Sequence, residues 1–159
     1  MRSRVILITT ALVAVTAVTT AATGAAGLAS AQSQTSVLTL LAPAGGTTTS
    51  IDLGKRGISP GDEFVTTNAP LRRPQSHVRA GRIDLIETAM GATRSSLSFT
   101  AQLPHGTLQV LGIYNPNNTR FTLPIVGGTG TYLGARGAVT LDSGASTPTL
   151  TFRLLAAPS

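Results

Sequence analysis

Short apolar segments rich in Val, Ile, Leu, Thr and Phe recur along the chain from Gln32 onward, with Gly, Pro or Asn between them. A recurrence of about eight to twelve residues is typical of an all-β sandwich or barrel, and no long segment has the period of a helix. The predicted strands are Ser36–Leu41, Thr49–Leu53, Asp62–Thr67, Arg82–Ala89, Ser95–Leu103, Thr107–Ile113, Arg120–Val126, Gly137–Asp142 and Thr149–Leu154.

Alternation within these strands predicts which side chains face the interior. In Arg82–Ala89 one face carries Ile83, Leu85, Glu87 and Ala89 and is apolar apart from the carboxylate, while the other face carries Arg82, Asp84, Ile86 and Thr88. In the following strands Phe99, Tyr114 and Phe121 share a face with other apolar residues. A closed barrel with a narrow lumen explains this pattern, and so does a sandwich.

Glycine and proline mark the predicted turns. Pro104-His105-Gly106 predicts a tight hairpin connection, and Asn115–Asn118 predicts a second turn. In the glycine-rich segment, Gly127, Gly128 and Gly130 predict a sharp corner rather than a packed strand. We expect Gly128 to have a positive φ there.

The first 31 residues have the pattern of a secretory signal peptide. Arg2 and Arg4 precede the apolar segment Val5–Val18, and Ala29-Ser30-Ala31 supplies small residues for cleavage before Gln32. A retained membrane anchor is the alternative, but the most apolar part is short and rich in threonine. The sequence therefore predicts a secreted protein with a single domain over residues 32–159 and no stable membrane association after cleavage.

Charge and composition narrow the classes of partner and chemistry. Lys and Arg outnumber Asp and Glu by 12 to 6, but the cations are scattered and the chain has four Phe, two Tyr and no Trp. Proteins that bind single-stranded nucleic acid combine basic grooves with stacking aromatic residues, so we expect no nucleic-acid partner. The absence of cysteine excludes disulfides, thiolate zinc sites and a cysteine nucleophile.

The remaining motifs predict neither a metal site nor a cofactor. His77 and His105 fall in predicted loops without an acidic neighbour at ligand spacing. No lysine follows Gly128-Thr129-Gly130 as a phosphate-binding loop requires, and Leu133 stands where a dinucleotide fingerprint needs glycine. Arg136 is interpreted as a structural residue that ties loop carbonyls together, with ligand binding as the alternative.

Several motifs, in matching order and spacing, resemble the barrel family shared by plant allene oxide cyclases and dirigent proteins. They are Gly61-Asp62, Asn68, Leu71, Gly81, Ser98-Phe99, Gly106, Gly112, Tyr114, Gly127-Gly128-Thr129-Gly130 and Ala135-Arg136-Gly137. The resemblance covers about Gly61–Asp142 and implies a closed antiparallel barrel of roughly eight strands, a size that can hold one small ligand. It also implies self-association, because members of this family are commonly trimers.

Three residues are candidates for chemistry. Glu87 would be poorly solvated on an apolar face and therefore suited to proton exchange, unless a bulge turns it to solvent. The resemblance implies that Tyr114 donates a hydrogen bond inside the pocket and that Asn68 positions a substrate oxygen or a water. The alternatives are a packed tyrosine and an asparagine needed only for the turn before Pro70.

Two departures from the cyclase pattern bear on activity. Glu87 stands where the cyclases carry a functional cysteine, and the predicted strand Ser36–Leu41 lacks their acidic residue. The first hypothesis is a cofactor-free cyclase or isomerase that folds an apolar small molecule inside the barrel. The second is a non-catalytic dirigent-like or lipocalin-like binder, and the third is an exported structural barrel filled by its own side chains. Whether the protein is an enzyme stays open at this point.

Overall fold

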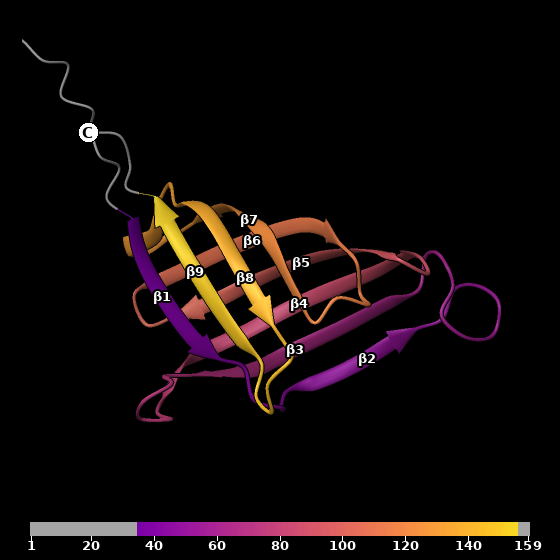
Figure 1. The fold of residues 1–159 in the computed structure, drawn as a ribbon, viewed down its shortest axis with the longest axis horizontal. Helices are drawn as coiled ribbons and strands as arrows, with labels where there is room; N and C mark the ends of the chain where they lie inside the picture. Colours follow the sequence, from indigo (N-terminus) through magenta and orange to yellow (C-terminus); the bar gives the residue numbers. More distant parts are fainter. Residues whose placement is uncertain (1–34, 156–159) are drawn as a thin grey trace, which may run out of the picture. The chain divides into compact units, whose positions relative to one another are not determined.

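The computed structural model describes residues 35–155, which form nine strands and one short 3-10 helix (Figure 1). The elements are β1 (Thr35–Leu41), β2 (Thr47–Ile51), β3 (Glu63–Arg72), β4 (Arg79–Gly91), β5 (Arg94–Leu103), β6 (Gly106–Tyr114), β7 (Arg120–Gly128), η1 (Gly130–Tyr132), β8 (Arg136–Asp142) and β9 (Thr149–Leu155). All nine predicted strands are present, and β3 and β4 extend several residues beyond their predicted ends. The predicted signal peptide and its cleavage site lie outside the described residues.

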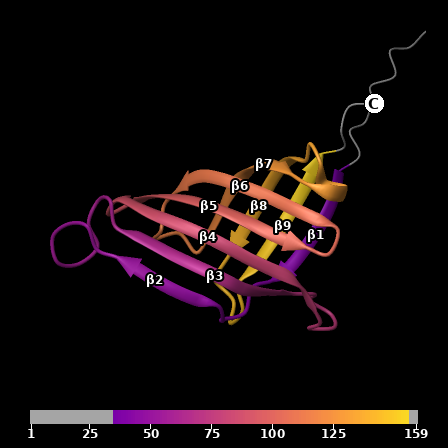
Figure 2. The same cartoon turned by 180° about the vertical axis from the view of Figure 1, so that it is seen from behind.

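The strands close into a barrel. Their order is β1-β9-β8-β7-β6-β5-β4-β3-β2, every neighbouring pair is antiparallel, and β1 also pairs with β3 at Leu41 and Arg72. The ring therefore contains eight strands, while β2 pairs with β3 alone and lies outside it (Figures 1 and 2). The all-β closed antiparallel barrel is confirmed, and the sandwich alternative is wrong.

Apolar side chains fill the middle of the barrel. Phe152, Leu108 and Val139 are fully buried, and the Phe99 and Phe152 rings meet edge to face at 6.5 Å between centroids. Phe99 lies on the interior face that the alternation predicted for its strand. We name the two ends of the barrel the Tyr114 end and the His105 end, after Tyr114 at the last position of β6 and His105 just before its first.

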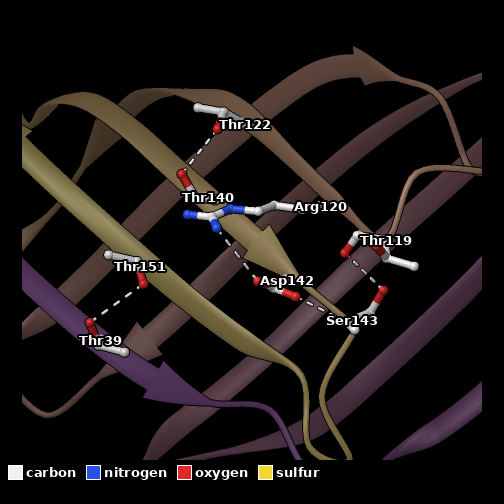
Figure 3. A network of polar contacts seen from close by, with 9 residues as sticks. Thr39, Thr119, Arg120, Thr122, Thr140, Asp142, Ser143 and Thr151 are labelled. Atoms are coloured by element: carbon white, nitrogen blue, oxygen red, sulfur yellow. Dashed lines mark hydrogen bonds and ion pairs between the residues drawn. The ribbon is translucent and has the colours of Figure 1, made fainter.

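The outer surface of β1, β7, β8 and β9 carries cross-strand polar pairs, which Figure 3 shows from close by. The Thr122 and Thr140 hydroxyls are 3.0 Å apart, and those of Thr39 and Thr151 are 3.5 Å apart. Cross-strand threonine pairs of this kind stabilise a sheet by a few tenths of a kcal/mol, about 0.2–1 each. Among residues 35–155 no helix is long and apolar enough to cross a membrane.

The glycine-rich corner lies slightly later than predicted. Gly127 and Gly128 belong to β7, and neither has a positive φ, so that expectation for Gly128 is wrong. The turn is made by Gly130, with φ of 61°, and by Gly134, with φ of 72°. Gly128 is needed for a different reason, since a Cβ atom there would lie 2.6 Å from the Thr107 carbonyl oxygen.

Candidate functional site

A cavity of about 290 Å³ opens at the Tyr114 end of the barrel. Most of its walls are apolar side chains from the interior faces of the strands, such as Ile83, Leu97 and Phe99. Glu87 on β4 and Tyr114 on β6 also line it. The pattern of β4 therefore predicted the direction of Glu87 correctly, and no bulge turns it to solvent.

Glu87 and Tyr114 form a hydrogen-bonded pair inside this cavity. The Tyr114 hydroxyl donates to Glu87 Oε1 at 2.6 Å. That distance is typical of a hydroxyl bound to a carboxylate, which is among the stronger hydrogen bonds in proteins. The two side chains come from the strands on either side of β5. Glu87 lies opposite Leu97, and Leu97 lies opposite Gly112, two residues before Tyr114, so the strand register brings the two side chains to the same part of the sheet.

The environment of Tyr114 keeps its proton in place. Burial raises the pKa of Tyr114 above its usual value of 10.0, and the hydrogen bond and negative charge of Glu87 raise it further. Tyr114 is therefore a hydrogen-bond donor at neutral pH. Its ring stacks on Phe121 with centroids 4.0 Å apart and planes at 23°, which gives the cavity one aromatic wall.

Asn68 does not join this pair. It is exposed in a bulge of β3, with a φ of 58°, and its side-chain oxygen accepts a hydrogen bond from Arg79 at 3.2 Å. Its backbone N–H donates to Asp84 Oδ1 at 2.7 Å. Asn68 does not line the cavity, although its neighbour Ala69 does. A left-handed backbone explains why asparagine occupies this position.

Two residues of the site were not singled out from the sequence. Phe121 stacks on Tyr114, and its place on an interior face of the predicted strand Arg120–Val126 was the available signal. Asp142 lines the mouth of the cavity, 4.0 Å from the Arg120 guanidinium (Figure 3). Its position at the end of a strand gave no indication of that location. Among residues 35–155 no three His, Asp or Glu side chains lie close enough together to hold a metal ion.

Comparison with known proteins shows similarity at the level of structure. Neither family models nor curated protein sequences match this chain. The solved structure of a pyocyanin demethylase superimposes with a TM-score of 0.67 at 21% identity, covering 75% of this chain and 99% of that one. A pterocarpan synthase dirigent protein superimposes with a TM-score of 0.57 at 17% identity, covering 78% of this chain and 96% of that one. The Diels–Alderase AbmU from Streptomyces koyangensis superimposes with a TM-score of 0.60 at 16% identity, covering 82% of this chain and 72% of that one.

Similarity at these identities establishes the fold. The matches include dirigent proteins, which the motifs from Gly61 to Asp142 had indicated, and they cover three quarters or more of the chain. This chain therefore has the closed β-barrel fold of the dirigent proteins and their structural relatives.

Proposed function

We propose that the barrel binds one small, largely apolar molecule in the cavity at the Tyr114 end and rearranges it without a cofactor. The Glu87–Tyr114 pair, set into apolar walls, is the observation on which this proposal rests. Solved structures with this fold include proteins named as a demethylase, a Diels–Alderase and a cyclase, which supports small-molecule chemistry inside the barrel.

The proposed reaction is a cyclisation or isomerisation in which a proton moves within the substrate. Glu87 takes a proton from one substrate atom as a carboxylate and returns it to another as a carboxylic acid, so the enzyme is unchanged after each turnover. Tyr114 donates a hydrogen bond to a substrate oxygen on which negative charge develops. The walls hold the substrate in one folded conformer, which lowers the entropic part of the barrier.

The cavity favours a neutral or cationic ligand with a flat apolar part. Glu87 inside the cavity would repel an anion, whereas the charge of Asp142 at the mouth is partly offset by Arg120. The stacked rings of Tyr114 and Phe121 offer a flat surface to an aromatic or conjugated group. A volume of about 290 Å³ is at the small end for ligand pockets, which fits one compact molecule.

Binding of two matched probes tests the site before a substrate is known. Indole is flat, neutral and carries an N–H donor, whereas 1-naphthoate is flat and anionic. Nuclear magnetic resonance titration should show that indole shifts the signals of Tyr114 and Phe121 and that 1-naphthoate does not. If both probes shifted the Tyr114 and Phe121 signals equally, or if neither probe shifted them, a ligand site shaped by Glu87 would be contradicted.

The alternative is a dirigent-like or lipocalin-like binder that orients an apolar molecule without transforming it. The dirigent proteins among the structural matches favour this second candidate. Glu87→Gln separates the two once a substrate is found, because an acid–base catalyst should lose about 10²–10⁴-fold in rate while binding persists. The open cavity counts against a purely structural barrel filled by its own side chains.

Self-association and export are further parts of the proposal. The outer surface of neighbouring strands exposes Ile86, Leu111, Ile113 and Val126, and Ile86 and Leu111 flank Ser98 in one cross-strand row. This apolar face suits the trimer that the family resemblance implies, and light scattering of the purified protein would measure the mass of the assembly.

Export is tested separately. Mass spectrometry of secreted protein should find Gln32 as the first residue, and an intact leader on a membrane-bound species would contradict export.

A further inference from the structure

A second cavity, of about 410 Å³, lies at the His105 end of the barrel. We call it the basic cleft, and its lining comprises Val37–Leu40 of β1, Arg73–Gln75, Ala80, Leu103–His105 and Tyr132. It follows from how the barrel closes. β1 pairs with β3 at one position only, Leu41 with Arg72, so the rest of β1 makes no ladder with β3 or β4.

The basic cleft combines an apolar floor with polar side chains at its edge. Leu40 and Ala80 are buried, and Leu38 and Leu103 pack against the same core. Arg73, His105 and Tyr132 contribute the polar groups. This arrangement differs from the cavity at the Tyr114 end, where the polar groups are a carboxylate and its phenol partner.

The backbone that carries Arg73 is held in place, while its guanidinium group remains available. In the β3–β4 turn the Arg73 N–H donates to the Val78 carbonyl at 2.9 Å, and the His77 N–H donates to the Arg73 carbonyl at 2.9 Å. Within residues 35–155 the Arg73 side chain has no ion pair or hydrogen bond. An arginine on a fixed turn presents five N–H donors at the edge of the cleft.

The distribution of charge makes this end attractive to anions. None of the six Asp and Glu residues of the chain lines the basic cleft. Arg72, Arg79, Arg136 and Arg153 lie near the strand termini at the same end of the barrel. Unopposed positive charge raises the local concentration of anions and speeds their binding.

We propose that the basic cleft is a second binding site, for a small organic anion with an apolar chain or ring. Its carboxylate binds the Arg73 guanidinium, where a planar two-point contact is geometrically favoured. Its apolar part lies against Leu38, Leu40 and Leu103. This site is independent of the proposed reaction at Glu87, because the packed middle of the barrel separates the two cavities.

Octanoate and octan-1-ol are suitable probes, since they share an apolar chain and differ in charge. Titration of ¹⁵N-labelled protein with octanoate should shift the amide signals of Val37–Leu40 and of residues 103–106, with weaker binding at high salt. Arg73→Gln should weaken octanoate binding about tenfold and leave octan-1-ol binding unchanged, because only the charged contact is lost. Arg94→Gln, an exposed arginine at the other end of the barrel, is the matched control and should have no effect.

Three results would overturn the proposal. Octanoate could shift Glu87 and Tyr114 instead, which would assign it to the other cavity. Arg73→Gln and Arg94→Gln could weaken binding equally, which would indicate unspecific attraction to a basic protein. Octan-1-ol could bind as tightly as octanoate, which would leave an apolar cleft without anion recognition. Glu87→Gln should not alter octanoate binding, so failure here is distinguishable from failure of the proposed function.

Discussion

Asp62 is a single buried carboxylate that organises the connection between β2 and β3. It is 4% exposed and accepts hydrogen bonds from the backbone N–H groups of Ser59 at 2.6 Å and Leu53 at 2.9 Å. The bond from Ser59, followed by that from Leu53, lowers the pKa of Asp62 from its usual 3.8. Asp62 was noticed in the sequence only as part of the motif Gly61-Asp62, and the structure supplies its physical role.

Asp62→Asn should lower the melting temperature at neutral pH, because an amide has one acceptor oxygen in place of two. A lowered folded-state pKa means that the stabilisation is complete above pH 3.8 and is lost as pH falls through the lowered value. Thermal melts between pH 7 and pH 2 should therefore show that the melting temperature of the wild type falls more steeply with decreasing pH than that of the variant. Asp52→Asn is the control, since Asp52 is exposed and accepts only one longer bond, from the Gly54 N–H at 3.3 Å.

Tyr114 gives a prediction at alkaline pH. Its raised pKa means that the folded state retains a proton that the unfolded chain has lost, so this contribution to stability is complete below pH 10 and disappears as pH rises further. Absorbance at the tyrosinate wavelength should show one tyrosine that titrates late. In Glu87→Gln this late titration should move to lower pH, since the carboxylate charge no longer opposes ionisation. A late titration that is unchanged in that variant would mean that Glu87 does not act on Tyr114.

Residue-level prediction from the sequence worked where the strands are regular. Alternation placed Glu87, Tyr114 and Phe121 on interior faces, because side chains change face with a fixed period of two. It did not place Asn68, because the bulge between Thr66 and Ala69 breaks that period. The match of Asn68 to a family motif therefore gave no information about where its side chain lies.

At the level of elements, the adjacent glycines of β7 offer a matched pair of substitutions. A Cβ atom on Gly128 would lie 2.6 Å from the Thr107 carbonyl oxygen, whereas on Gly127 the nearest atom would be Gln109 Oε1 at 3.5 Å. Gly128→Ala should lower the free energy of unfolding by about 1–3 kcal/mol, as expected for overpacking. Gly127→Ala should lower the free energy of unfolding by a smaller amount. Urea unfolding followed by circular dichroism measures both. Similar losses in the two variants would mean that β7 can move away from β6.

The ends of β3 show where sequence patterns stop being sufficient. Asn68-Ala69-Pro70 predicted the end of this strand, because proline cannot donate to a ladder. β3 nevertheless continues to Arg72, with Pro70 opposite Arg82 just beyond the bulge. The position of β2 outside the ring was equally unpredictable, since it depends on which partner β3 has on its other edge. The presence of each strand follows from its own local sequence, whereas the pairing of strands depends on residues that are far apart in the chain.

At the scale of the whole molecule, the two ends of the barrel differ in charge. At the Tyr114 end Glu63, Glu87 and Asp142 are accompanied by Arg94 and Arg120. Toward the His105 end lie Arg72, Arg79, Arg136 and Arg153, and no acidic residue lines the basic cleft there. The sequence showed only that cations were scattered, because antiparallel strands bring distant residues to the same end. This polarity is what makes one cavity suited to neutral or cationic ligands and the other to anions.

The barrel contains no disulfide, so its stability depends on the closed sheet and its packed centre. Phe152 is 0% exposed at that centre, whereas Phe121 is half-buried at the cavity and stacks on Tyr114. Phe152→Ala should lower the free energy of unfolding by about 3–5 kcal/mol, because the cavity left behind is enclosed on all sides. For a domain with a stability of about 5–15 kcal/mol this is a large fraction.

Phe121→Ala should cost less stability, because part of its ring already faces open space, but it should weaken indole binding at the Tyr114 end. Phe152→Leu keeps most of the buried volume, so its free energy of unfolding in urea should lie between those of the wild type and Phe152→Ala. Substitution of Phe152 should therefore change mainly the stability of the barrel, and substitution of Phe121 mainly its binding of indole. If Phe121→Ala instead destabilised the barrel as much as Phe152→Ala and left indole binding intact, the cavity at the Tyr114 end would be part of the core rather than a binding site.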